Sequence, residues 1–273
     1  MNNWTSNFFT AYNSTKLHYY RTDGDKPPLM LIHGITDDAL CWTRLAKDLE
    51  ADYDIIMLDQ KGHGKSSDPN DGYDFKTIAA EVSELIQALG LEKPILLGHS
   101  LGAMTSLSVG TYYPDLPRAL VLEDPPPFWK AAPPAEAAEE SAGGIYAWLI
   151  AAKRMTLDEL FTLGREDRKW SDDEIALWAD AKHRFSPKLI NVASQYAKLG
   201  DDYTERMKSI PCPTLLLSAD PAMGAIIKPE DASDLRQFIP QLQHVNIPNA
   251  GHSIHREQYD DLLTAVHTFL KEI

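Results

Sequence analysis

The sequence around Ser100 has the residue types and spacing of a nucleophile turn. A short apolar run at Ile95–Leu97 predicts a buried strand, and a helical pattern follows the GHSLG segment at residues 98–102. The glycines two positions before and after the serine allow backbone segments to approach too closely for a Cβ atom. A serine on such a strand–turn–helix is lifted off the sheet beside the Leu101 amide, and we expect Ser100 to be a nucleophile.

A nucleophilic serine needs a base to accept its proton and an acid to orient that base. His252 lies in a loop after the last predicted strand, where it can reach back over the sheet, whereas the competing His255 begins the final helix. Two aspartates also follow predicted strands, Asp124 after the sixth and Asp220 after the seventh. Either of them could instead cap the turn that follows it.

The elements that must position these residues alternate along the chain as strand and helix. An antiparallel hairpin is predicted near the N-terminus over Phe8–Tyr20, and continuous apolar runs such as Tyr53–Leu58 predict buried strands. This alternation predicts a doubly wound, mostly parallel sheet of eight strands with helices on both faces. Such sheets bind ligands at the carboxyl ends of their strands, which is where Ser100 and Asp124 fall.

The alternation stops after Asp124 and returns at Thr214. The residues between them show helical patterns, with a capping box at Ser171 and Glu174. A helical segment at this point would cover the carboxyl ends of the strands as a lid. The predicted parts are a first core segment (1–127), the helical lid inserted after the sixth strand (128–207) and a second core segment (208–273).

Composition narrows the range of partners. The 273 residues include 26 Lys and Arg against 40 Asp and Glu, and the net charge of −14 disfavours binding to nucleic acid or an anionic membrane. The two cysteines, Cys41 and Cys212, lie in apolar segments and are expected to be buried thiols. Because no leader pattern and no run of 18 apolar residues is visible, we expect a cytoplasmic protein, a monomer or a homodimer.

With these motifs in this order, the chain resembles the α/β-hydrolase superfamily over nearly all of its length. The matching motifs are the His33–Gly34 turn, the DQKGHGKS loop at 59–66, the GHSLG turn and the Gly251–His252 pair. Lys61 stands where the family usually has arginine. The resemblance implies a serine hydrolase that needs no cofactor and no metal. It leaves the substrate open, because this fold supports many chemistries.

The resemblance also bears on the choice of acid. Most members of the family carry the acid a few residues after the seventh strand, at a position that Ala222 occupies here, so Asp220 is displaced by two residues. Lidded relatives such as haloalkane dehalogenases and zearalenone lactonase resemble this chain and carry the acid after the sixth strand. We therefore favour Asp124, with Asp220 and then Glu123 as alternatives.

The remaining site residues are predicted from turn position and aromatic content. The backbone N–H groups of Ile35 and Leu101 are expected to stabilise the oxyanion, each typically by ~3 kcal/mol. Aromatic side chains at the entry to the lid and within it are expected to line an apolar pocket over Ser100. The predicted substrate contacts are Phe128, Trp129, Trp148 and His99.

The predicted function is hydrolysis of a small, largely apolar carboxylic ester or lactone through an acyl-enzyme on Ser100. A C–C bond hydrolase acting on a β-diketone or meta-cleavage product would use the same residues. Epoxide hydrolases and dehalogenases of this fold carry aspartate where this chain has Ser100, which disfavours their chemistry. A non-catalytic ligand receptor on the hydrolase scaffold is the third alternative.

Overall fold

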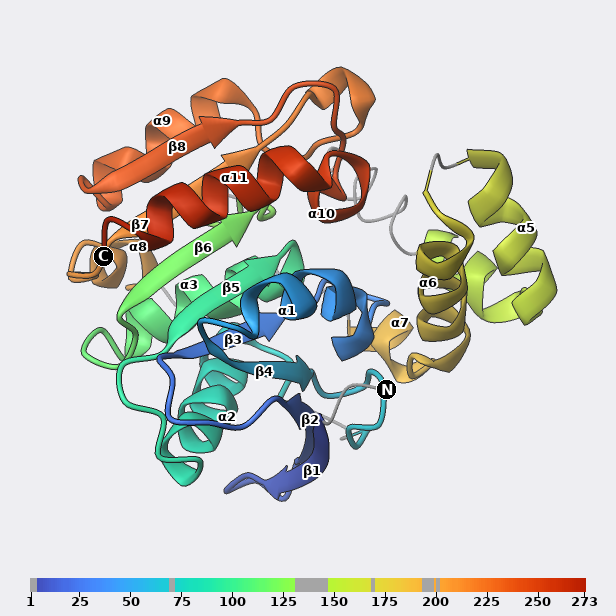
Figure 1. Ribbon diagram of the computed structural model, residues 1–273, viewed down its shortest axis with the longest axis horizontal. Coiled ribbons are helices and arrows are strands. Elements are labelled where there is room, and N and C mark those ends of the chain that lie inside the picture. Colours follow the sequence, from blue (N-terminus) through green and yellow to red (C-terminus); the bar gives the residue numbers. More distant parts are fainter. Residues whose placement is uncertain (1–3, 69–71, 131–146, 168–169, 193–198, 200–201) are drawn as a thin grey trace.

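The computed structural model describes residues 4–68, 72–130, 147–167, 170–192, 199 and 202–273 (Figure 1). Among these residues, eight strands form one sheet in the order β1-β2-β4-β3-β5-β6-β7-β8. The strands are β1 (Thr5–Thr10), β2 (Lys16–Arg21), β3 (Pro28–Ile32), β4 (Asp54–Asp59), β5 (Ile95–His99), β6 (Ala119–Glu123), β7 (Thr214–Ser218) and β8 (Leu242–Asn246). The helices are α1 (Thr43–Leu49), α2 (Phe75–Ala88), α3 (Leu101–Tyr112), α5 (Leu157–Asp167), α6 (Asp172–Arg184), α7 (Lys188–Val192), α8 (Tyr203–Met207), α9 (Pro229–Phe238), α10 (Ile254–Glu257) and α11 (Tyr259–Leu270), with short 3₁₀ turns η1 (Ala39–Trp42) and η3 (Pro221–Met223).

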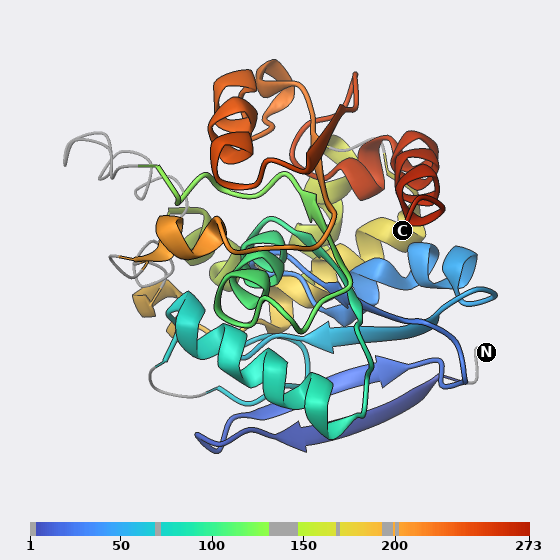
Figure 2. The ribbon, with the colours of Figure 1, turned by 90° about the vertical axis from the view of Figure 1, so that its left-hand side faces the viewer.

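The sheet combines an antiparallel hairpin with a parallel core. β1 pairs antiparallel with β2 and β2 with β4, whereas every pairing from β4 through β3 to β8 is parallel. Figure 2 shows the β1–β2 hairpin at one edge of the sheet and β8 with α9 at the other. Strands β4 to β7 are buried along their whole length, as parallel strands covered on both faces must be. The predicted doubly wound, mostly parallel sheet is confirmed.

Helices cover both faces of the sheet (Figure 1). On one face, Ile78 of α2 and Leu107 of α3 belong to a hydrophobic cluster that also contains residues of α9. On the other face, Leu45 of α1 and Leu262 of α11 belong to a second cluster. Both cysteines are buried free thiols, as predicted. With both faces covered, the loops at the strand ends remain as the place for a site.

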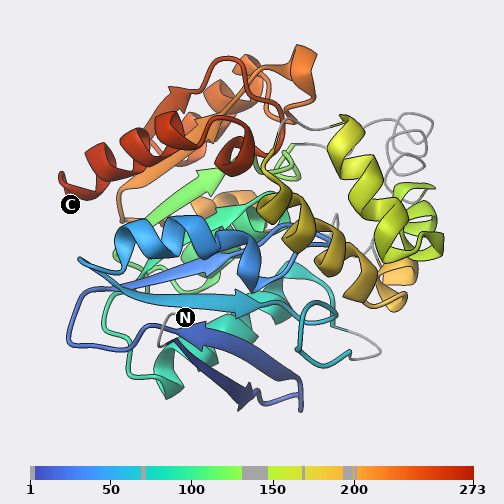
Figure 3. The ribbon, with the colours of Figure 1, turned by 45° about the vertical axis from the view of Figure 1, so that its right-hand side comes forward.

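Helices α5 to α8 lie between β6 and β7 in the chain. The α6 helix begins after Ser171, whose side chain accepts a hydrogen bond from the Glu174 amide at 3.3 Å. Figures 1 and 3 show α5 and α6 on the side toward which the parallel strands point. Part of the segment predicted as a lid lies outside the described residues. None of the described helices is long and apolar enough to cross a membrane.

Candidate active site

The turn at Ser100 joins β5 to α3. Ser100 has φ 53° and ψ −115°, a backbone conformation that side chains rarely adopt. A Cβ on Gly98 would lie 2.1 Å from the carbonyl oxygen of Gly102, and a Cβ on Gly102 would lie 2.0 Å from that of Ile32. Both positions therefore require glycine, and the turn has the close backbone packing that the glycine spacing predicts.

A tightly held loop brings His252 to this turn. A Cβ on Gly251 would lie 2.2 Å from the carbonyl oxygen of Met223, and the Gly251 N–H donates to Glu257 Oε2 at 2.5 Å. The His252 carbonyl accepts a hydrogen bond from His99 Nε2 at 2.8 Å, and the centroids of these two rings are 4.6 Å apart. His252 is thus fixed beside the residue that precedes the nucleophile position.

Asp124 holds the ring of His252. Asp124 Oδ2 lies 2.6 Å from His252 Nδ1, and the amides of Ile226 and Ile227 donate to its two carboxylate oxygens at 2.8 and 2.9 Å. Asp124 is fully buried, and its φ of 41° lies in the left-handed region. Because a carboxylate only accepts hydrogen bonds, Nδ1 of His252 carries the proton. Nε2 of a neutral His252 is then left as a proton acceptor.

The other two candidate acids have different partners. Asp220 Oδ1 accepts a hydrogen bond from the Ala222 amide at 2.8 Å and caps η3. Glu123 is buried, and its Oε1 accepts from the backbone amide and Nδ1 of His255 at 2.9 and 2.8 Å. Of the three acids, the structure places Asp124 alone against His252.

The hydroxyl of Ser100 has no hydrogen-bond partner among the residues that the structure describes. Its side chain is nearly buried, with 6% of the residue exposed, and its amide donates to the Glu123 carbonyl at 2.8 Å. The hydrogen bond from Ser100 to His252 that acyl transfer requires is therefore not formed here. Catalytic hydrogen bonds of this kind are often long without substrate and tighten when it binds.

The two amides predicted for the oxyanion are free of protein acceptors within the described part of the chain. The Leu101 amide is at the N-terminus of α3, where helix amides lack partners and carry partial positive charge. Ile35 follows the turn after β3, where His33 Nδ1 donates to the Gly34 carbonyl at 2.7 Å. Burial lowers the pKa of His33. A neutral His33 therefore supports this turn as a fixed hydrogen-bond donor.

His99 lies within the protein between two loops of the site. It is 4% exposed, and a Cβ on Gly34 would lie 2.7 Å from its Nδ1. Burial lowers the pKa of His99 well below its ordinary value. Its ring supports the Gly34 turn and the His252 carbonyl, and its predicted contact with substrate stays a prediction.

The aromatic residues predicted to contact substrate pack against the core and against each other. Trp129 is buried in the hydrophobic cluster on the α2 and α3 face. Phe128 is half-buried, with its ring centroid 6.1 Å from that of Phe75. Trp148 stacks on Trp178 of α6 at 6.2 Å. These contacts tie the entry of the helical segment to the core, and a role in substrate binding stays a prediction.

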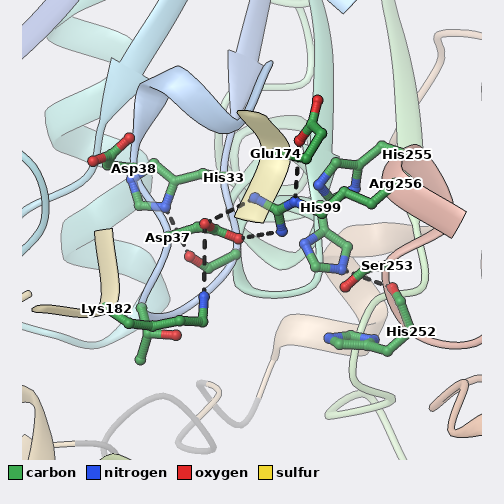
Figure 4. A network of polar contacts seen from close by, with 12 residues as sticks. His33, Asp37, Asp38, His99, Glu174, Lys182, His252, Ser253, His255 and Arg256 are labelled. Atoms are coloured by element: carbon green, nitrogen blue, oxygen red, sulfur yellow. Dashed lines mark hydrogen bonds and ion pairs between the residues drawn. The ribbon is translucent and has the colours of Figure 1, made fainter. Parts of the chain in front are cut away.

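Four charged side chains, of which Asp37, Lys182 and Arg256 are buried and Glu174 is half-buried, form a buried ion group that joins three segments around the site (Figure 4). Arg256, in α10, binds both oxygens of Asp37 at 2.8 and 3.0 Å. Lys182 and Glu174 of α6 lie 3.7 Å from Asp37 and 3.6 Å from Arg256, respectively. Burial alone would raise the pKa of Asp37, but Arg256 and Lys182 hold it well below its usual value. The group ties α6 to the loops that carry the Ile35 amide and His252.

Sequence reasoning missed this ion group, because nothing local in a sequence pairs Asp37 with a residue 219 positions away. No local pattern marks Arg256, four positions after His252, as the partner of Asp37.

Two sets of buried side chains bring metal-ligand atom types within 4.8 Å of one another: Asp37 with Cys41 and His255, and His99 with Glu123 and His255. Both oxygens of Asp37 are engaged by Arg256, and His255 Nδ1 is engaged by Glu123. The first set is therefore not assigned to a metal. In the second set, His99 Nδ1, Glu123 Oε2 and His255 Nε2 are buried and have no hydrogen-bond partner among the described residues.

Comparison with known proteins shows the family of the chain. A family model described as "Alpha/beta hydrolase family" matches residues 29–265. The chain is 31% identical over 263 residues to N-formylmaleamate deformylase of Pseudomonas putida, covering 94% of each chain. It is 24% identical to the sn-1-specific diacylglycerol lipase of Mus musculus, over 93% of this chain and 85% of the lipase. The crystal structure of E-2-(acetamidomethylene)succinate hydrolase superposes with a TM-score of 0.82 at 23% identity, covering 98% of this chain and all of that one.

Proposed function

This chain belongs to the alpha/beta hydrolase family and is a hydrolase, and we propose that it cleaves a small, largely apolar carboxylic ester or lactone through an acyl-enzyme on Ser100. The observation that carries the proposal is the position of Asp124. Its buried carboxylate is held by two amides and lies 2.6 Å from Nδ1 of a histidine fixed beside the strained Ser100 turn. This is the arrangement of acid, base and nucleophile that acyl transfer uses.

In the proposed mechanism, Ser100 Oγ attacks the acyl carbon while His252 Nε2 accepts its proton. Asp124 keeps the His252 proton on Nδ1 and stabilises the imidazolium that forms. The amides of Leu101 and Ile35 donate to the oxyanion of the tetrahedral intermediate. His252 then gives its proton to the leaving alcohol, and a water activated by the same ring hydrolyses the acyl-enzyme.

We also propose that residues 128–207 act as a cap over the site, with 1–127 and 208–273 as the core. Support comes from α6, whose Lys182 and Glu174 belong to the buried ion group and reach Asp37 after the Ile35 turn and Arg256 after the His252 loop. The aromatic residues Phe128, Trp129 and Trp148 would then supply apolar surface on the substrate side. A small substrate fits a site placed between a cap and the strand ends.

A second candidate is hydrolysis of an amide that carries a short acyl group. The observation that favours it is the 31% identity over 94% of the chain with a deformylase that acts on N-formylmaleamate. Amide hydrolysis uses the same nucleophile and base, but it needs His252 to protonate a poorer leaving group. The candidates therefore differ in substrate and share the proposed residues.

A rate comparison over four substrate types tests both candidates. Initial rates are measured on a p-nitrophenyl acetate and butyrate pair, a δ-lactone, an N-formyl and N-acetyl anilide pair, and a β-diketone, each with wild type and Ser100→Ala. We expect ester or lactone turnover that Ser100→Ala lowers by ~10⁴-fold or more. A preference for the anilides would support the second candidate, and turnover of the diketone alone would indicate C–C cleavage. If no substrate shows turnover that depends on Ser100, the proposal is wrong, and the receptor alternative takes its place.

A further inference from the structure

A second set of hydrogen-bonded serine, histidine and aspartate side chains lies outside the candidate active site, across strands β1, β2 and β4. Ser6 Oγ is 2.8 Å from His18 Nε2, and His18 Nδ1 is 2.7 Å from Asp59 Oδ2. The strand register explains the arrangement. His18 lies opposite Asp59 on β4 and opposite Phe8 on β1, so Ser6 is its diagonal neighbour on the same face of the sheet. Figures 1 and 3 show this hairpin at the edge of the sheet, away from the helices α5 and α6.

The aspartate of this second set, Asp59, is held as a carboxylate by its hydrogen bonds. Asp59 is 2% exposed and accepts hydrogen bonds from the amides of Ala39 and Lys65 at 2.7 and 2.9 Å. Burial raises its pKa, but the hydrogen bond from His18 and the two amides outweigh burial and hold the pKa below its ordinary value. A carboxylate accepts the Nδ1 proton of His18, which leaves Nε2 of the neutral ring as an acceptor for the Ser6 hydroxyl proton.

His18, the base of this group, is buried, whereas Ser6 is an exposed residue. His18 has no exposed surface, and the rings of Phe8 and Tyr20 pack edge-on against it with centroids 5.0 and 4.7 Å away. Ser6 is exposed on β1, the edge strand of the sheet. A reagent in solution can therefore reach the Ser6 hydroxyl, although the imidazole that would take its proton is held inside the sheet.

We propose that Ser6 is a second activated serine, which accepts a covalent acyl or phosphonyl group from an activated ester or a fluorophosphonate. Ser6 Oγ forms a bond to the acyl carbon or the phosphorus, and its proton passes to His18 Nε2. The bond to the leaving group breaks, and the leaving group departs with its electron pair and takes the proton from His18. The products are a Ser6 ester and the protonated leaving group.

The adduct on Ser6 accumulates and is not turned over rapidly. Ser100 lies at the N-terminus of α3, where an amide is positioned beside the developing oxyanion. Ser6 lies inside β1, and none of the described helices begins at it as α3 begins after Ser100. Removing one oxyanion donor typically costs about 10²–10³-fold in rate. We therefore expect stoichiometric modification of Ser6, slower than the reaction at Ser100.

Peptide mapping of the folded Ser100→Ala chain after exposure to a fluorophosphonate tests this proposal. Ser14 is the internal reference, since it is exposed in the turn of the same hairpin and has no histidine partner among the described residues. A positioned general base contributes about 10²–10⁴-fold. We expect label on Ser6 to form at least about 10²-fold faster than label on Ser14.

Two variants in the Ser100→Ala background complete the test. Ser6→Ala should abolish the adduct, and His18→Gln should slow labelling of Ser6 to the rate of Ser14. The proposal is overturned if label forms on Ser6 no faster than on Ser14 in the chain whose hairpin is unsubstituted. This comparison does not depend on whether a variant of the sheet folds. The proposal is also overturned if a folded His18→Gln chain labels Ser6 as fast as its parent. Labelling of Ser100 is measured separately in the wild type, so the proposal for Ser6 and the proposed function at Ser100 can be refuted independently of each other.

Discussion

Replacing Asp124 by asparagine should remove most of the activity and leave the fold. In the wild type, Asp124 Oδ2 accepts from both His252 Nδ1 and the Ile226 amide, while Oδ1 accepts from the Ile227 amide. An asparagine has one oxygen for these three donors. Its NH₂ group must face either the Ile227 amide, or the Ile226 amide together with His252. In the second orientation His252 Nδ1 becomes the acceptor, and Nε2 carries the proton and cannot act as base.

The size of the effect follows from the charge that is lost. With the centres of an imidazolium and a carboxylate about 4 Å apart, their attraction is about 4 kcal/mol at an effective dielectric constant of about 20. Losing this attraction in the transition state slows the reaction about 10³-fold, and the wrong tautomer brings the loss toward ~10⁴-fold. One buried amide left unpaired should also lower the free energy of unfolding by about 1–3 kcal/mol.

The assay is kcat/KM on the best ester found for the wild type, with the midpoint of urea unfolding measured beside it. Asp220→Asn is the matched control, because Asp220 caps an exposed turn through the Ala222 amide. We expect this control to stay within about twofold of wild type, since surface changes of this kind have small effects. A loss below tenfold in Asp124→Asn would refute the reasoning, as would an equal loss in the two variants.

Three further predictions concern the His252 loop, the buried ion group and the pH dependence of the stability of the fold. Gly251→Ala places a Cβ 2.2 Å from the Met223 carbonyl oxygen, so we expect a loss of at least tenfold in kcat from the displaced His252 loop, checked by steady-state kinetics beside a melting curve. Lys182→Met removes the ion pair that α6 makes with Asp37 and should lower kcat/KM at least tenfold. The control Arg165→Met removes the exposed pair with Asp172 and should change kcat/KM less than twofold. Equal effects of the two variants would contradict a role of α6 in holding the site. Burial together with a neighbouring imidazole lowers the pKa of His63 to about 3, so between about pH 6.5 and 3 the unfolded chain binds the extra proton and stability falls as the pH falls. Relative to pH 7.5, this histidine alone should cost about 2 kcal/mol at pH 5 in urea unfolding, and an equal or higher stability at pH 5 would contradict it.

Much of the fold could be predicted because its strands are apolar runs separated by helical patterns. The error at β4 is instructive. The run Tyr53–Leu58 predicts a strand one residue earlier than the observed Asp54–Asp59. Hydrophobicity misses the charged strand end, which is buried because Asp59 is hydrogen-bonded to His18 and to backbone amides. A sequence pattern records the apolarity of a residue, and it does not record the partners that allow a charge to be buried.

In the candidate site, too, features that depend on a local pattern could be predicted and features that depend on tertiary contacts could not. The turn at Ser100 could be predicted, because its glycine spacing is a local requirement of backbone packing. The choice among candidate acids depends on which carboxylate meets His252 in space, and the amides of Ile226 and Ile227 that hold Asp124 lie 102 and 103 positions away. The buried ion group and the hydrogen-bonded set Ser6, His18 and Asp59 depend entirely on such tertiary contacts, so no local pattern indicates them.

Fluorophosphonate labelling of the wild-type chain tests the proposed function most directly. Intact mass and peptide mapping are recorded after a short exposure and compared with Ser100→Ala, with circular dichroism to show that both chains are folded. We expect label to form on Ser100 faster than on any other serine, and we expect the variant to lack this adduct. A folded wild type in which Ser100 stays unlabelled would contradict an activated serine at this turn.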